Sequence, residues 1–156
     1  MSAASHELAQ MNVALPAAPL ESPVMAEFMA NLDRINALAE ASPGFVWRLQ
    51  DDGGNATALR PMGPDAIVNM SVWRDAAALS EFVHKSGHVE YLKRRREWFQ
   101  RIAEAYVVLW WVPKGHRPTM EEGVARLTKL RAEGPTPEAF TFRQAFPAPS
   151  SSAELA

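Results

Sequence analysis

Apolar side chains recur along this sequence at two spacings, one typical of strands and the other of helices. Residues 6–15 alternate between two faces and predict a strand, which Pro16 ends. Ser22-Pro23 then suits the start of a helix, and apolar residues three and four apart continue as far as Ser42-Pro43-Gly44. The beginning of the chain therefore predicts a strand followed by a long amphipathic helix.

The middle of the chain predicts two more strands and a second helix. Residues 45–49 form a short apolar run, a turn rich in Asp and Gly follows, and residues 66–74 (AIVNMSVWR) alternate clearly. Asp75 can cap the next helix, which stops near Gly87. Both faces of the strand at 66–74 carry apolar groups, so both faces should be covered.

Two further helices and one strand are predicted after residue 87. Residues 88–103 predict a third helix, and residues 106–112 (YVVLWWV) predict a buried strand rich in β-branched and aromatic side chains. Thr119 and Glu122 are placed as a capping box for another helix, for which Gly134 is a suitable stop.

The order of these elements is close to the βαββαβ plan of ferredoxin-like domains. Strands and helices are interspersed, and the short connection at 50–65 permits a hairpin, so we predict an α+β fold with an antiparallel or mixed sheet. An extra helix and a short strand, in which Phe140 and Phe142 alternate, follow at the C-terminal end. We expect one domain over residues 1–147 and a disordered tail over residues 148–156.

Composition narrows the classes of protein. The chain has 156 residues, of which 47% are hydrophobic and 22% charged, as is ordinary for one globular domain. A net charge of -2 gives no general attraction for nucleic acids, and the lack of cysteine excludes disulfides and thiolate metal sites. No apolar run reaches the ~20 residues of a membrane span. We therefore expect a soluble, cytoplasmic protein with no nucleic-acid or membrane partner.

The helix predicted at 88–103 contains the two candidate catalytic residues. Three of its five basic residues, Lys93, Arg94 and Arg101, are interpreted as a solvated face, and two of them follow a glutamate by four residues. Arg95 has no carboxylate within easy reach on this helix, and His88 lies two turns away on the same side. We predict His88 as an acid/base and Arg95 as an anion-stabilising residue. The structural alternatives are an Arg95 that snorkels to water and a His88 that only completes the helix start.

Polar groups on otherwise apolar strands predict a binding surface beneath this helix. Asn69 and Ser71 alternate onto one face with Trp73, and Asn12 is a polar group of the first strand. Structural hydrogen bonding is the alternative for each polar group, and core packing is the alternative for each aromatic one. The predicted substrate-binding residues are Asn12, Trp47, Asn69, Ser71, Trp73, Phe82, Phe99 and Trp110. Trp98 is predicted to lie on a flank or rim.

The opposite face of the predicted sheet is apolar. If helices cover only one face, this second face should bury against another sheet, which predicts a homodimer closed by sheet-to-sheet packing. The residues assigned to this second face are Met11, Val13, Val68, Met70, Val72 and Trp111.

Several familiar catalytic motifs are absent from the sequence. It contains no GxxxxGK[ST], GxGxxG, HExxH or GxSxG, so nucleotide-binding, zincin and hydrolase-elbow chemistries lack support. His84 and His88 are four residues apart, but Gly87 between them should break the helix. No metal site is therefore predicted.

Four blocks of the sequence closely resemble the bacterial family called domain of unknown function 3291: SPGFVWRL, NMSVW, SGH…RRREWF and LWWVP…GPT…AFTF. The resemblance extends from His6 to Pro147. It implies a dimeric α+β barrel, in a superfamily that is similar to antibiotic-biosynthesis monooxygenases, stress-responsive barrel proteins and haem-dependent chlorite dismutase relatives. The resemblance implies a fold and a homodimer without fixing a reaction, because that superfamily holds oxygenases, isomerases and haem enzymes.

Three functions follow as hypotheses. The first is a monooxygenase-like enzyme without a cofactor, which binds a flat apolar or aromatic small molecule in a pocket between sheet and helices. It would abstract a proton from an activated phenol or enol before reaction with oxygen. The second is a haem enzyme with His88 as axial ligand. The third is a non-catalytic dimeric protein that binds a metabolite.

Overall fold

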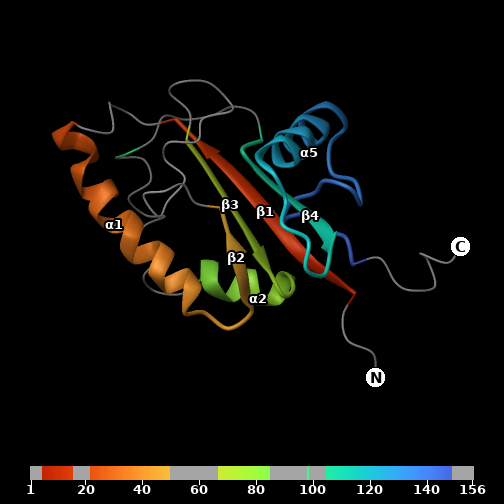
Figure 1. Cartoon of the computed structure of the whole chain (residues 1–156). Coiled ribbons are helices and arrows are strands. Elements are labelled where there is room, and N and C mark those ends of the chain that lie inside the picture. The colour runs from red at the N-terminus through yellow and green to blue at the C-terminus, as the bar shows by residue number, and fades with distance from the viewer. Residues whose placement is uncertain (1–4, 16–21, 50–66, 85–97, 99–104, 149–156) are drawn as a thin grey trace, which may run out of the picture.

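A computed structural model describes residues 5–15, 22–49, 67–84, 98 and 105–148. Over these ranges the chain forms a four-stranded antiparallel sheet of order β2-β3-β1-β4, with helices on both of its faces (Figure 1). The strands are β1 His6–Ala14, β2 Phe45–Arg48, β3 Ile67–Trp73 and β4 Val107–Pro113. The helices are α1 Pro23–Glu40, α2 Ala76–Val83 and α5 Met120–Glu133. The predicted α+β fold with a C-terminal helix is confirmed.

Local signals set the starts of the first two helices. Ser22 has extended backbone and Pro23 occupies the first helical position of α1, as predicted. At the start of α2 the Asp75 carboxylate accepts a hydrogen bond of 2.8 Å from the backbone amide of Ala78. This bond satisfies one of the amides that a helix start leaves without an intrahelical partner.

The start of α5 differs in one respect from the predicted capping box. The Thr119 hydroxyl accepts a hydrogen bond of 3.1 Å from the Glu122 amide, as expected. The Glu122 carboxylate does not return to the backbone of Thr119, because it is hydrogen-bonded to the side chains of Trp110 and His116. Gly134 ends the helix with a φ of +77°, a region that favours glycine.

The predicted final strand is reduced to isolated bridges. Phe140 pairs with Leu109 of β4 through two backbone hydrogen bonds, of 2.8 and 2.9 Å, and Thr136 pairs with Ala139 across a turn. Phe140 is buried and Phe142 is exposed, so the side chains alternate as expected although no strand forms within residues 134–148.

Alternation along the strands divides the sheet into two faces. The first lies under α1 and α2, and we call it the polar face because Gln10 lies opposite Ser71 there and Asn12 lies opposite Asn69. Its strand residues are Leu8, Gln10, Asn12, Asn69, Ser71, Trp73 and Leu109. The second, which we call the α5 face, comprises Ala9, Met11, Val13, Val68, Met70, Val72, Val108, Trp110 and Val112.

Helix α5 covers the second face within the same chain, which corrects the expectation that helices lie on one face only. Leu127 and Leu130 pack against it, and its strand residues are at most 4% exposed. The helix approaches so closely at Gly123 that a Cβ there would lie 2.5 Å from Met11 Sδ and 2.6 Å from Met70 Cε. A second sheet is therefore not needed to bury this surface.

The predicted position of Trp111 is wrong. The register of β4 pairs Trp110 with Ala9 and Trp111 with Leu8, so it is Trp110 that lies on the α5 face. The Trp111 indole N–H donates a hydrogen bond of 2.9 Å to the backbone carbonyl of Phe146 on the other side of the sheet.

None of the helices in the described ranges is long and apolar enough to cross a membrane.

Candidate functional site

A hydrogen-bonded network of polar side chains occupies the middle of the polar face. Gln10 Nε2 donates to Asn69 Oδ1 and to Ser71 Oγ, both at 2.8 Å. Asn12 Nδ2 donates to Gln10 Oε1 at 3.2 Å and more weakly to Asn69 Oδ1 at 3.4 Å. The indole N–H of Trp73 donates to Ser71 Oγ at 2.8 Å. The network thus joins two strands through side chains that point between the sheet and the helices.

The network leaves some polar groups without partners among the described residues; Ser71 is buried, whereas Asn12 and Asn69 are partly exposed. Ser71 is 7% exposed, and its oxygen already accepts two hydrogen bonds, so its own hydrogen must be donated elsewhere. Within the described ranges, neither that hydrogen nor the Asn69 Nδ2 group has an acceptor, and Asn12 Oδ1 has no donor. Buried polar groups are normally hydrogen-bonded, and leaving one unpaired costs about 1–3 kcal/mol. Among the described residues, these groups are the part of the polar face with unused hydrogen-bonding capacity.

Aromatic side chains flank one end of this network. The ring of Trp73 stacks on that of Phe82 from α2 with centroids 5.1 Å apart, and it meets Phe45 of β2 edge-on at 5.4 Å. Trp73 is almost fully buried, so its ring is part of the core while its N–H orients Ser71. The structure therefore brings five of the predicted binding residues together on one face: Asn12, Asn69, Ser71, Trp73 and Phe82.

Two predicted binding residues lie on the other side of the sheet. Trp47 is the cross-strand partner of Val72, and Trp110 is the partner of Ala9, so both project onto the α5 face. The sheet itself separates these two rings from the network.

Three predicted residues, His88, Arg95 and Phe99, lie outside the described residues. Their roles stay predictions. Trp98 is described and is 2% exposed, with its ring 5.7 Å from that of Phe28 on α1. It is therefore a core residue, and its predicted position on a rim is wrong.

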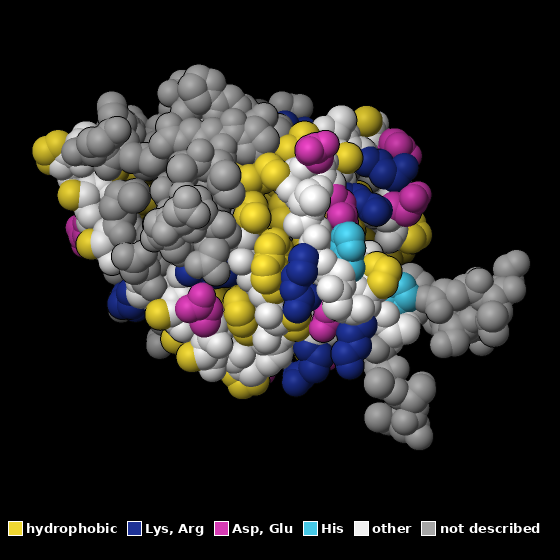
Figure 2. All heavy atoms as spheres, viewed as in Figure 1, with side chains coloured by type: hydrophobic (Ala, Val, Ile, Leu, Met, Phe, Trp, Pro, Cys, Tyr) yellow, Lys and Arg dark blue, Asp and Glu magenta, His cyan; other side chains and the backbone are white. Residues whose placement is uncertain are grey.

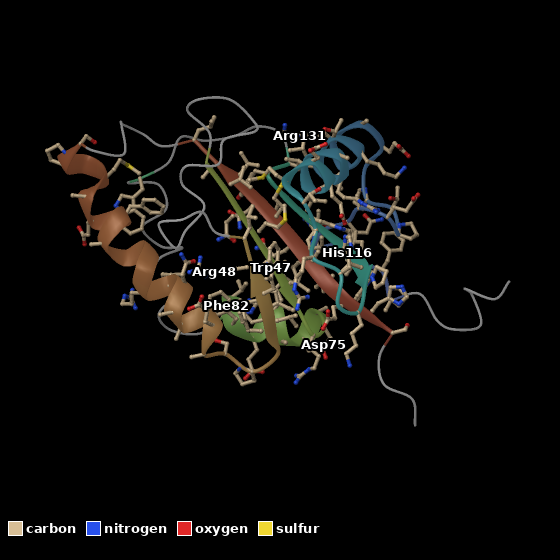
Figure 3. All side chains as sticks on the ribbon, in the orientation of Figure 1. Trp47, Arg48, Asp75, Phe82, His116 and Arg131 are labelled. Atoms are coloured by element: carbon tan, nitrogen blue, oxygen red, sulfur yellow. The ribbon has the colours of Figure 1, made fainter. Side chains whose placement is uncertain are left out.

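The structure adds two residues that sequence reasoning did not select. Gln10 shared the predicted strand face with Asn12, and that alternation was a sufficient signal to find it. Arg48 is the cross-strand partner of Ser71, and its Nε donates to the Glu40 carboxylate of α1 at 2.9 Å (Figure 3). A register shift between Phe45 and Trp47 turns Arg48 to this face, and simple alternation does not reveal such a shift.

A second polar cluster lies at the start of α5. The Glu122 carboxylate contacts the indole N–H of Trp110 at 2.8 Å and Nε2 of His116 at 2.7 Å. Burial opposes ionisation of this carboxyl, but the hydrogen bonds from His116 and Trp110 outweigh it and lower the pKa of Glu122 below its usual value. This cluster links α5 to β4 on the α5 face.

Among the described residues, no group of three or more His, Cys, Asp or Glu could hold a metal ion.

The profile of the family DUF3291, Domain of unknown function, matches residues 7–156 of this chain. No curated protein matches the sequence. Among solved structures, protein PA3566 from Pseudomonas aeruginosa is 14% identical with a TM-score of 0.50, and the match covers 74% of this chain and 100% of that one.

A second similar structure is a protein from Nitrosomonas europaea that has been assigned to the antibiotic biosynthesis monooxygenases. It is 9% identical with a TM-score of 0.50, and the match covers 76% of this chain and 100% of that one. SnoaB, a cofactor-independent oxygenase from Streptomyces nogalater, is 21% identical with a TM-score of 0.45 over 76% of this chain and 100% of its own. The likeness of the first two structures supports the α+β fold.

Proposed function

The chain belongs to the DUF3291 family, and from that premise we propose that it binds a small organic molecule between the polar face and the helices. We further propose monooxygenase-like chemistry on an apolar or aromatic substrate, without a cofactor. The observation that carries the proposal is the buried Ser71 hydroxyl. Its oxygen accepts hydrogen bonds from Gln10 and Trp73, and its hydrogen has no acceptor in the described part of the chain.

The network offers a ligand both kinds of hydrogen-bonding group. The Ser71 hydroxyl and the Asn69 amide can donate to an oxygen of the substrate, and Asn12 Oδ1 can accept from a substrate hydroxyl. Donors fixed by their own hydrogen bonds stabilise negative charge without reorganising. This arrangement suits an activated phenol or enol whose oxygen gains charge when a proton is removed.

The proposed reaction consumes dioxygen as the second substrate. A base removes a proton from an enolisable ring CH₂, and the resulting anion reacts with dioxygen. One oxygen atom becomes the product carbonyl, and the other leaves as water with the two hydrogens. We propose His88 as the base and Arg95 as an anion-stabilising residue. The assignment of the Nitrosomonas europaea protein supports this class of reaction by analogy of fold alone.

Binding of 1-naphthol, measured by calorimetry, tests the ligand site. We expect Ser71→Ala and Asn69→Leu each to weaken binding about tenfold, because each removes a donor to the ligand oxygen. Thr128→Ala is the matched control, since this exposed hydroxyl bonds only the backbone carbonyl of Val124 on α5. Failure of the folded wild type to bind 1-naphthol or anthrone would sink the proposal.

Uptake of dioxygen in the presence of anthrone tests the chemistry separately. We expect wild type to consume dioxygen and His88→Ala to lose that activity by about a hundredfold or more, as removal of a general base does. If anthrone binds but is recovered unchanged, the result would contradict the proposed monooxygenase-like reaction. The protein would then be a non-catalytic protein that binds a metabolite.

We also propose that the protein is a cytoplasmic homodimer. Figure 2 shows hydrophobic side chains gathered in a band beside α5. Three partly buried residues of this side follow one another at the β2 edge of the sheet, Val46, Trp47 and Leu49. An apolar edge of this kind is suited to contact a second copy. A monomeric mass in sedimentation at micromolar concentration would contradict the dimer and leave the ligand site untouched.

A further inference from the structure

Helix α1 carries a polar side chain, Asn36, on the side that packs on the sheet. Asn36 is 6% exposed, and at 100° per residue it points within about 60° of Met25 and Ala39. Met25 is fully buried, and Ala39 belongs to the apolar cluster that also contains Leu8 and Trp73 of the polar face. The Asn36 side chain therefore lies on the side of α1 that faces the polar face of the sheet.

The amide of Asn36 has no hydrogen-bond partner in the part of the chain that the structure describes. A buried amide normally has partners, and here its two N–H donors and its carbonyl acceptor are all unused. Asparagine also has a lower helix propensity than alanine or leucine, so folding alone does not explain this residue inside α1. The other buried polar side chains of the described ranges each make a hydrogen bond: Glu7, Gln10, Ser42 and Ser71.

The contact between α1 and β2 relates Asn36 to the network of the polar face. Glu40 lies one turn after Asn36 on the same side of the helix, and its carboxylate contacts Nε of Arg48, the cross-strand partner of Ser71. Figure 1 shows α1 and β3 running in the same general direction, toward α2. One turn back along α1, about 5.4 Å, therefore corresponds to about two residues back along β3, from Ser71 to Asn69. This places Asn36 on the helix side of the network, at the level of Asn69.

We infer that Asn36 is a second ligand-binding residue, and that the ligand is a planar ring with oxygens on two opposite edges. The inference rests on the proposed function, because it concerns the ligand of the same site. One oxygen of the ligand binds the Ser71 hydroxyl and the Asn69 amide of the sheet, and the other binds the Asn36 amide of α1. This amide can donate to a carbonyl or accept from a hydroxyl. Contacts at both edges fix the orientation of the ring, whereas a ring held at one edge can rotate.

The experiment compares 1,5-dihydroxynaphthalene with 1-naphthol by calorimetry under nitrogen, which prevents reaction with dioxygen. The two probes differ only in the hydroxyl on the opposite edge of the ring. We expect wild type to bind the diol about five- to tenfold more tightly, as one further buried hydrogen bond provides. Asn36→Leu should reduce this preference to less than about twofold and leave the affinity for 1-naphthol within about twofold of wild type.

Thermal unfolding without ligand separates this role from a structural one. Because the amide is unpaired in the described structure, Asn36→Leu should unfold at the same temperature as wild type or at a higher one. Ala37→Leu is the matched control, since it places the same side chain on the exposed side of the same turn and should change neither affinity. If Asn36→Leu does not fold, Asn36→Ala takes its place in the binding comparison and should show the same loss of preference.

The outcomes distinguish this inference from the proposed function. Equal affinity of wild type for the two probes, with 1-naphthol still bound, would overturn the inference and leave the proposed function standing. A preference for the diol that survives in the Asn36 variants would also overturn it, because the second oxygen would then bind elsewhere. A folded Asn36→Leu that unfolds at a markedly lower temperature would make the amide a structural group, with the same result. If wild type binds neither probe, both proposals fail.

Discussion

The two faces of the sheet are built from the same strands but are stabilised in different ways. On the α5 face the central residues of β1, β3 and β4, such as Ala9, Met70 and Trp110, are apolar and buried, and α5 supplies leucines that pack against them. On the polar face, Gln10 and Ser71 are about as well buried, yet they depend on one another for hydrogen bonds and leave donors unused. Apolar burial stabilises by about 25 cal/mol per Å², whereas a buried unpaired donor destabilises. The α5 face serves folding, and the polar face combines a core with the proposed ligand site.

The largest effect on stability is expected on the α5 face. Leu127→Ala removes a fully buried side chain from α5 and should lower the free energy of unfolding by about 2–5 kcal/mol. Urea denaturation measures the loss. Affinity for 1-naphthol, measured well below the unfolding transition, should stay within twofold of wild type. A loss of affinity as large as that of Ser71→Ala would mean that the two faces are not separate in function.

A smaller loss of stability than that of Leu127→Ala is expected when a polar residue of the polar face is removed. Ser71→Ala removes the acceptor of two buried donors, the Trp73 indole and the Gln10 amide, and should cost about 1–3 kcal/mol. Urea denaturation and near-ultraviolet circular dichroism of the tryptophans report on it. Trp73→Phe combined with Ser71→Ala should cost less than the sum of the two single substitutions, because they share one hydrogen bond.

Glu122→Gln should lower the free energy of unfolding by about 1 kcal/mol, and the size of this loss should depend on pH. Because the pKa of Glu122 is lowered in the folded protein, its contribution is present above its ordinary pKa of 4.5 and is lost as pH falls through the lower, folded value. Glu122→Gln should therefore be less stable than wild type at pH 7 and equally stable near pH 2. A difference between the two proteins that is unchanged from pH 7 to pH 2 would contradict this assignment.

The smallest effect on stability is expected from making the polar face resemble the α5 face. Replacing Gln10, Asn12 and Asn69 together by leucine or valine removes donors and acceptors as a set, so the free energy of unfolding should stay within about 1 kcal/mol or rise. Binding of 1-naphthol should nevertheless be lost. A variant that unfolds cooperatively at the wild-type urea concentration and still binds would show that the network is structural only.

Much of this comparison was predictable from alternation, and the exceptions have physical causes. Alternation in β1 and β3 correctly placed Asn12, Asn69 and Ser71 on one face and Met11 on the other. In β2 the register shift moved Trp47 to the opposite face, and alternation assumes that no such shift occurs. In β4 two adjacent tryptophans are equally apolar, so only the pairing with β1 decides which one lies on which face.

Helix packing was less predictable than strand pairing. The apolar stripe of α5 indicated that the helix is buried on one side, but a stripe does not say which surface it meets. The contact at Gly123 with Met11 and Met70 decides it, because only a residue without a side chain permits that approach. Trp98 was misplaced for a similar reason, since its burial depends on Phe28 of α1, seventy residues earlier in the chain.

The position of β1 in the sheet has a consequence for how the chain folds. β1 is first in chain order but central in the sheet, and it pairs with β4 in a register that joins His6 to Pro113. During synthesis, about a hundred residues must therefore follow β1 before β4 exists and both edges of β1 can be paired. Contacts of such long sequence separation slow folding and leave strand edges open in the meantime. We expect refolding to be limited by closure of β4 onto β1.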